Sequence, residues 1–120
     1  MSGLQIIADA RAQWHLSDRG AIERWLTQAA ELAGMTILGW QSWTLPSALD
    51  NGPGVSITAE LVESHAAVET WPEEGIICLC FYSCHPWEPG LVMDYFKRYF
   101  GVTEMLVYQE IERFGRKGKR

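Results

Sequence analysis

Long apolar runs are missing from this sequence. None approaches the roughly 20 residues that a helix needs to cross a bilayer. The first residues, MSGLQIIADARAQ, lack the basic start and the apolar stretch of a signal peptide. These absences predict a cytoplasmic protein with no membrane partner.

Cysteine is also scarce. Cys78, Cys80 and Cys84 are the only three, and they lie within seven residues. An odd number at so close a spacing fits neither a disulfide framework nor a zinc site built from paired ligand clusters. The sequence therefore predicts reduced thiols and no metal site. The three alternate with Tyr82, which predicts one strand face packed in the core, and only Cys84 is a candidate for chemistry.

Basic residues are few outside the C-terminus. All fifteen acidic residues lie at or before Glu112, whereas five of the ten basic residues lie at or after Arg113. The negative field of the body disfavours nucleic acid and favours a cationic ligand. The chain is long enough for one domain and too short for two. We expect a single domain over residues 1–114 and a solvated basic tail over 115–120.

Two segments have helical periodicity. Apolar residues three or four apart predict a helix of about four turns after Ser17, the expected N-cap, with Gly34 placed to end it. A second helix is predicted over 91–100 and is closed by Gly101. Strands are predicted over residues 4–8, 35–43, 55–62, 66–70, 75–83 and 103–112.

This order of elements predicts an α+β fold. We expect a two-layer sandwich, in which an antiparallel sheet of about six strands has two helices on one face. The other face of the sheet would be left over, and the chain has six tryptophans available for contacts there. A homodimer is therefore expected.

The stretch LVESHAAVETWPE sets Ser64 between Glu63 and His65, shortly before Trp71 and Pro72. Nothing in general folding physics requires that arrangement. It resembles the bacterial and archaeal S-adenosylmethionine decarboxylases, in which a Glu-Ser-His triplet is followed by Thr-Trp-Pro-Glu and then by an aromatic-Thr-Cys-Gly strand end. Further matches in chain order are AAELAGMTIL (29–38), PGVS (53–56), YSC (82–84), PWEPGLVMDYFKRYF (86–100) and VYQEIERF (107–114).

The resemblance implies that the chain cuts itself between Glu63 and Ser64. In this family the serine hydroxyl attacks the carbonyl of the preceding glutamate, β-elimination breaks the resulting ester, and the freed dehydroalanine hydrolyses to a ketone. Ser64 would become a pyruvoyl cofactor at the start of the second fragment. A Schiff base between this group and the substrate amine would take up the electrons left when CO₂ departs.

The resemblance also implies roles for other residues. Ser56 would assist the cleavage, and Cys84 would protonate the carbanion after decarboxylation. Glu73 would bind the ribose hydroxyls of the substrate, and Trp43 would stack on its adenine. The candidate catalytic residues are Ser64, Cys84, Ser56, Glu69, His65 and Glu63, and the candidate substrate-binding residues are Glu73, Trp43 and Trp71.

Structural roles are open alternatives for several of these side chains. His65 could be a turn residue bound to backbone, and Trp71 could fix the turn with its indole in the core. His85 could cap the second helix. Glu69 could point outward into solvent.

Glu69 stands where the family has a second histidine, which is a base in self-cleavage. Near the pyruvoyl group, this carboxylate would favour a substrate with a distal positive charge, such as ornithine or arginine. Without self-cleavage, the chain would instead be a non-catalytic paralogue that acts as a binding or regulatory subunit. The leading expectation is a pyruvoyl-dependent S-adenosylmethionine decarboxylase of polyamine synthesis.

Overall fold

The computed structural model describes residues 3–46 and 52–114. The predicted basic tail over 115–120 lies outside them. None of the helices in the described part of the chain is long and apolar enough to span a membrane. The elements follow in the order β1 (Gly3–Ala12), α1 (Arg19–Leu32), β2 (Ile37–Leu45), β3 (Gly54–Leu61), β4 (Ser64–Trp71), η1 (Pro72–Glu74), β5 (Ile76–Ser83), α2 (Pro89–Phe100) and β6 (Val102–Arg113).

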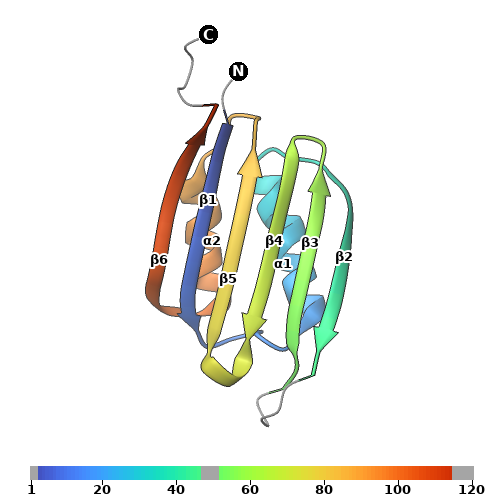
Figure 1. The fold of residues 1–120 in the computed structure, drawn as a ribbon, viewed down its shortest axis with the longest axis vertical. Coiled ribbons are helices and arrows are strands. Elements are labelled where there is room, and N and C mark those ends of the chain that lie inside the picture. The colour runs from blue at the N-terminus through green and yellow to red at the C-terminus, as the bar shows by residue number, and fades with distance from the viewer. Residues whose placement is uncertain (1–2, 47–51, 115–120) are drawn as a thin grey trace.

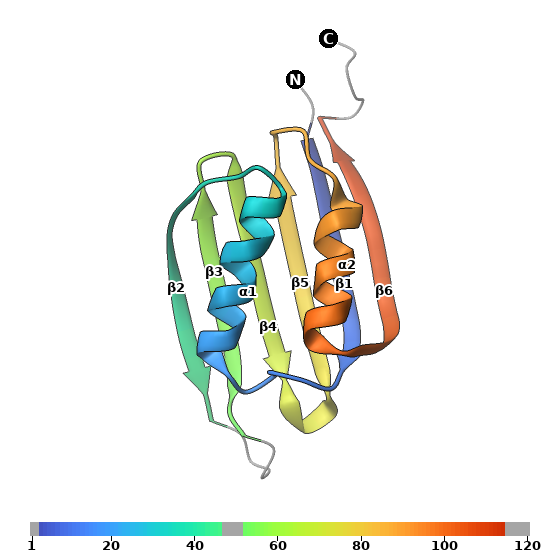
Figure 2. The same ribbon diagram turned by 180° about the vertical axis from the view of Figure 1, so that it is seen from behind.

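The six strands form one antiparallel sheet in the order β2-β3-β4-β5-β1-β6. Both helices lie on the same face of this sheet, as Figure 2 shows, and the other face is uncovered in the single chain (Figure 1). We call the uncovered side the open face. The predicted α+β two-layer sandwich is confirmed.

The core lies between the sheet and the two helices. Residues alternate between buried and accessible along β3 and β5, as expected for strands with one covered face. Trp25 of α1 is fully buried and contacts α2, with ring centroids 5.6 Å from Phe96 and 5.5 Å from Phe100. These aromatic contacts hold the two helices together and so support the sheet beneath them.

Several local predictions are wrong in detail. The N-cap of α1 is Asp18, one residue after the predicted Ser17, because the Asp18 carboxylate accepts a hydrogen bond from the backbone N–H of Ala21 at 3.0 Å. The N-cap of α2 is Glu88 and not His85. Gly101 does close α2, in the left-handed conformation that glycine adopts without a Cβ clash.

The predicted core positions of some side chains are also wrong. The Trp71 indole is 39% exposed, because Trp71 points to the open face while its neighbour Pro72 is buried. Cys78 and Cys80 are only partly buried, since they too lie on the open face. Cys84 does not share their strand face, because β5 ends at Ser83 and Cys84 is exposed in the segment that follows.

The Asp18 cap gives a stability prediction. Replacing Asp18 by Ala leaves the Ala21 N–H without its side-chain acceptor, and we expect the free energy of unfolding to fall by about 1 kcal/mol. Asp18→Asn keeps an acceptor oxygen and is the matched control, with little change expected. Urea unfolding measures the free energy of unfolding of both variants. An equal decrease in Asp18→Asn and Asp18→Ala would contradict capping as the cause.

Candidate functional site

The peptide bond between Glu63 and Ser64 lies in the turn that joins β3 to β4. Ser64 is the first residue of β4 and pairs with Ser83, the last residue of β5. Cys84 therefore comes directly beside the turn. The β3–β4 turn and the start of the β5–α2 connection lie at the same end of the sheet (Figure 1).

The carbonyl of Glu63 accepts two hydrogen bonds from Cys84. The backbone N–H of Cys84 donates at 3.4 Å and its thiol donates at 3.2 Å. Donors aimed at a carbonyl oxygen draw electron density from the carbonyl carbon and stabilise negative charge on the oxygen during nucleophilic attack. The carbonyl in question belongs to the bond before Ser64.

The Glu63 side chain fixes the turn from the other side. Its carboxylate accepts a hydrogen bond from the backbone N–H of Thr36 at 3.2 Å, and the N–H of Val62 donates to the Thr36 carbonyl at 2.9 Å. Thr36 lies in the connection between α1 and β2, so a segment that comes earlier in the chain holds the turn.

The Ser64 hydroxyl contacts His65. Ser64 Oγ lies 3.2 Å from His65 Nδ1, a hydrogen-bonding distance. The exposed imidazole packs beside Tyr82, with ring centroids 5.6 Å apart, and the guanidinium of Arg113 lies over the same Tyr82 ring at 4.7 Å. The sequence left open a hydrogen bond from His65 to the backbone, but in the structure its Nδ1 lies at the Ser64 hydroxyl.

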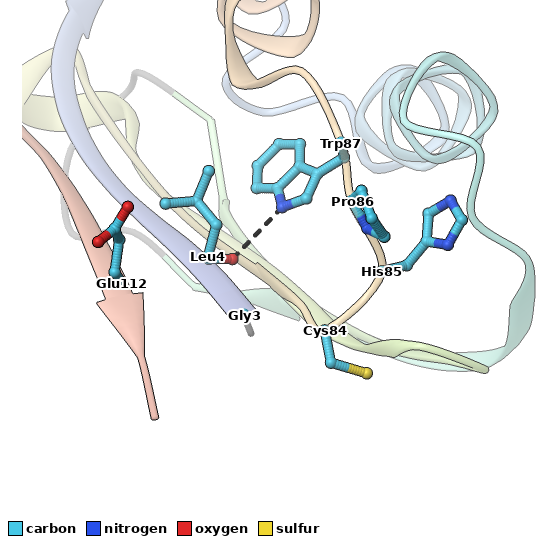
Figure 3. A pocket seen from close by; sticks show the side chains of 7 residues that line it. All are labelled: Gly3, Leu4, Cys84, His85, Pro86, Trp87 and Glu112. Atoms are coloured by element: carbon cyan, nitrogen blue, oxygen red, sulfur yellow. Dashed lines mark hydrogen bonds between the residues drawn. The ribbon is translucent and has the colours of Figure 1, made fainter. Parts of the chain in front are cut away.

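A small cavity of about 190 Å³ opens beside Cys84 (Figure 3). The indole N–H of Trp87 donates to the Leu4 carbonyl at 3.4 Å on its wall, and the Cys84 side chain points away from Trp87. Pockets that hold drug-sized ligands usually measure about 300–1,000 Å³, so this cavity alone is too small for a nucleoside-sized molecule. The lining residues are Gly3, Leu4, Cys84, His85, Pro86, Trp87 and Glu112.

A second group of candidates forms a row across the open face. Trp43 on β2 pairs with Ser56 on β3, Ser56 pairs with Glu69 on β4, and Glu69 pairs with Cys78 on β5. We call these four residues the open-face row. The Ser56 hydroxyl donates to Glu69 Oε2 at 3.4 Å, and the Trp43 indole is 60% exposed. Glu69 points away from the helices, which agrees with the alternative that its side chain faces solvent.

The open-face row is strongly acidic where it meets β1. Burial, a hydrogen bond to Asp9 and the charges of Asp9 and Glu69 together raise the pKa of the Cys78 thiol to about 12. The sheet register explains the pairing, because Asp9 stands directly opposite Cys78. Cys78 is therefore a protonated thiol at neutral pH.

The two groups do not meet within one chain. Glu69 lies five residues along β4 from Ser64, roughly 17 Å at the rise of a strand, and an odd offset turns the two side chains to opposite faces. Glu73 lies in η1, at the end of the sheet far from the β3–β4 turn (Figure 1). Trp71 is the residue directly before η1. The structure thus joins Glu63, Ser64, His65 and Cys84, and leaves Ser56, Glu69, Trp43, Trp71 and Glu73 apart from them.

Sequence reasoning gave no site role to three neighbours of the Glu63–Ser64 turn, which we call the cleavage turn after the predicted cut. Thr36, Tyr82 and Arg113 come from three distant parts of the chain, and only the strand pairing brings them near Ser64 and His65. The spacing of Thr36 and Arg113 in the sequence carries no signal, whereas Tyr82 lies two residues before Cys84 in the YSC match. Within residues 3–46 and 52–114, no cluster of three or more His, Cys, Asp or Glu side chains could hold a metal ion.

Known proteins are similar to this chain in fold and in sequence. The crystal structure of the adenosylmethionine decarboxylase from Aquifex aeolicus VF5 superposes with a TM-score of 0.80 over 98% of this chain and 95% of that chain, at 25% sequence identity. The S-adenosylmethionine decarboxylase proenzyme of Saccharolobus solfataricus is 37% identical over 71 residues, which is 59% of this chain and 52% of that protein.

A longer match is to the S-adenosylmethionine decarboxylase proenzyme of Sulfurisphaera tokodaii, which is 36% identical over 91 residues, or 76% of this chain and 66% of the relative. The aligned part of the chain spans about half the length of the first of these curated relatives. The family model of S-adenosylmethionine decarboxylase matches residues 4–114. The chain therefore belongs to the S-adenosylmethionine decarboxylase family.

Proposed function

We propose that this protein is a pyruvoyl-dependent decarboxylase of S-adenosylmethionine that cuts itself between Glu63 and Ser64. The observation that carries the proposal is the Glu63 carbonyl, which accepts hydrogen bonds from both the N–H and the thiol of Cys84. A peptide bond in a surface turn has no folding need for such donors from a distant residue. The names of the relatives, which are proenzymes of this decarboxylase, support the same function.

Self-cleavage needs a nucleophile beside a polarised carbonyl. The Ser64 hydroxyl is adjacent to the Glu63 carbonyl in the chain, and Cys84 donors would stabilise the oxyanion formed when the hydroxyl attacks. The carbon–nitrogen bond breaks to leave an ester, elimination across Ser64 then frees the Glu63 carboxylate, and hydrolysis of the dehydroalanine releases ammonia and leaves a ketone. The pyruvoyl group so formed would supply the electron sink for loss of CO₂.

The fold tolerates a break at this position. Residues 1–63 supply β1, α1, β2 and β3, and residues 64–120 supply β4, β5, α2 and β6. β1 lies between β5 and β6 in the sheet, and β3 pairs with β4, so each fragment is hydrogen-bonded to the other along several strands. The two fragments would therefore stay together after cleavage.

A homodimer would complete the site. The open-face row and Glu73 lie away from Ser64, and the cavity beside Cys84 is too small for a nucleoside. If the open faces of two copies pack with their strands antiparallel about a two-fold axis, the Ser64 end of one copy lies over the row of the other. The exposed Trp43 indole and the Glu69 carboxylate then suit the adenine and the sulfonium charge of the substrate.

In this arrangement each residue has a distinct task. Cys84, exposed beside the cleavage turn, would deliver a proton to the substrate carbon after CO₂ leaves. Ser56 and Glu69 of the partner copy would position the reacting groups, and Glu73 would bind ribose hydroxyls. A cytoplasmic location and a role in polyamine synthesis belong to the same proposal.

The intact mass of freshly purified protein under denaturing conditions tests the cleavage. We expect two fragments, residues 1–63 and 64–120, the second with an N-terminus that reacts with a carbonyl reagent. The cleaved protein should release CO₂ from S-adenosylmethionine. A full-length species that stays uncut on prolonged incubation would contradict the enzyme, and CO₂ release from ornithine or arginine alone would contradict the substrate.

Two variants serve as controls for that measurement. Ser64→Ala removes the nucleophile and should leave the chain at full length with its fold unchanged. Cys84→Ser keeps a hydrogen-bond donor to the Glu63 carbonyl, whereas Cys84→Ala keeps only the backbone N–H. We expect the alanine variant to cleave about tenfold more slowly than the serine variant, in line with the loss of one weak oxyanion donor.

Co-expression of two inactive variants tests whether two copies share a site. Ser64→Ala and Ser56→Ala should each be inactive, but their mixed dimer contains one site in which both residues are intact. With random pairing we expect about a quarter of the activity of the unmodified dimer to return.

The matched control pairs Ser64→Ala with Cys84→Ala. These residues lie in the same group of one chain, so their mixed dimer has no intact site and should remain inactive. Recovery in this pair, or no recovery in the first pair, would contradict a site shared between copies.

A further inference from the structure

We propose that His65 takes the proton from the Ser64 hydroxyl in the first step of self-cleavage and passes it to the Ser64 nitrogen. This inference rests on the proposed function, since it assigns a base to the cleavage. The proposed cleavage has a nucleophile in Ser64 and an oxyanion donor in Cys84, but so far no acceptor for the proton of the Ser64 hydroxyl.

The distance between the two side chains is suited to this transfer. Ser64 Oγ lies 3.2 Å from His65 Nδ1. When the imidazole carries its proton on Nε2, Nδ1 presents a lone pair and accepts from the serine hydroxyl. A general base must be within such a hydrogen bond of the proton that it removes.

Other candidates around the turn are poorly placed for the same task. The Cys84 thiol donates its own proton to the Glu63 carbonyl and so is not an acceptor in this geometry. Glu69 lies five residues along β4 on the open face, where it accepts from Ser56. Among the residues that the structure describes, the one titratable side chain seen to hydrogen-bond to Ser64 Oγ is His65.

Neighbouring strands hold the imidazole in position. Tyr82 on β5 stands directly opposite His65 and packs against its ring, and the guanidinium of Arg113 at the end of β6 lies over the same Tyr82 ring. Arg113 is itself held by a hydrogen bond to Gln5 Oε1 at 3.0 Å. From β3, Glu60 stands opposite His65. Tyr82 thus limits the rotation of the ring and favours the orientation in which Nδ1 reaches Ser64.

The proposed step balances without any other reactant. A bond forms between Ser64 Oγ and the carbonyl carbon of Glu63, and the bond from that carbon to the Ser64 nitrogen breaks. The proton leaves Oγ for His65 Nδ1 and then moves to the departing nitrogen, which becomes a free amine. The product is an ester isomer of the peptide, with no net gain or loss of protons.

Newly synthesised chains from a cell-free system allow each stage to be timed. We would follow the unmodified protein, His65→Asn and His65→Ala by intact mass, with and without hydroxylamine, which cuts an ester but not a peptide bond. We expect both variants to cleave at least tenfold more slowly than the unmodified chain, and their uncut chains to resist hydroxylamine. Added imidazole should restore cleavage of His65→Ala, a rescue that a purely structural role would not give.

The matched control is His15→Asn. His15 is another exposed histidine, at the opposite end of β1 from the cleavage turn, and its positive φ suits asparagine. It should cleave at the unmodified rate.

Three results would overturn the inference, each for a different reason. Unmodified rates in both His65 variants would show that the histidine is dispensable while the proposed function stands. Hydroxylamine-sensitive ester that builds up in the variants would place His65 after the first step. Failure of the unmodified chain to cut would remove the proposed function together with the inference.

Discussion

The antiparallel pairing of β4 with β5 is the constraint on which the site depends. This register sets Ser64 opposite Ser83, and so Cys84 meets the carbonyl of Glu63 although the two residues are 21 positions apart. A shift of one residue would turn every side chain of β4 to the other face of the sheet. It would bury His65 and Glu69 beneath the helices and expose Ala66 and Val68. The hydrophobic core therefore enforces the same register that brings the cleavage turn and its hydrogen-bond donors together.

The packing of the helices makes the sheet rigid enough for this purpose. Trp25 of α1 fills the space between the helices against Phe96 and Phe100, and both helices cover the same face. β1 is inserted between β5 and β6, so the first half of the chain is hydrogen-bonded within the second half. The proposed cut would therefore leave the two fragments hydrogen-bonded to each other. The open face remains accessible in one chain, and it carries the open-face row.

Much of the architecture could be predicted from the sequence. Each predicted strand and helix is present, because their apolar periodicities are strong and Gly101 closes α2 as expected. Some boundaries differ from the prediction: β1 reaches Ala12 instead of ending near residue 8, since pairing with β5 and β6 extends it beyond its apolar run. The Asp18 cap and the outward Trp71 depend on local geometry that neighbouring apolar residues do not reveal.

The sequence by itself determined the family, the fold class and the residues on either side of the cleavage turn, because Glu63, Ser64 and His65 are contiguous and their order is the motif. It did not determine which candidates act together. Only the tertiary structure decided that Cys84 lies at the Glu63 carbonyl while Ser56 and Glu69 lie elsewhere on the open face. The physical reason is that strand register decides which distant residues stand side by side in the sheet, and side-chain alternation decides which face each side chain occupies. Contacts such as Tyr82 with His65 or Arg113 with Tyr82 exist only once that sheet has formed.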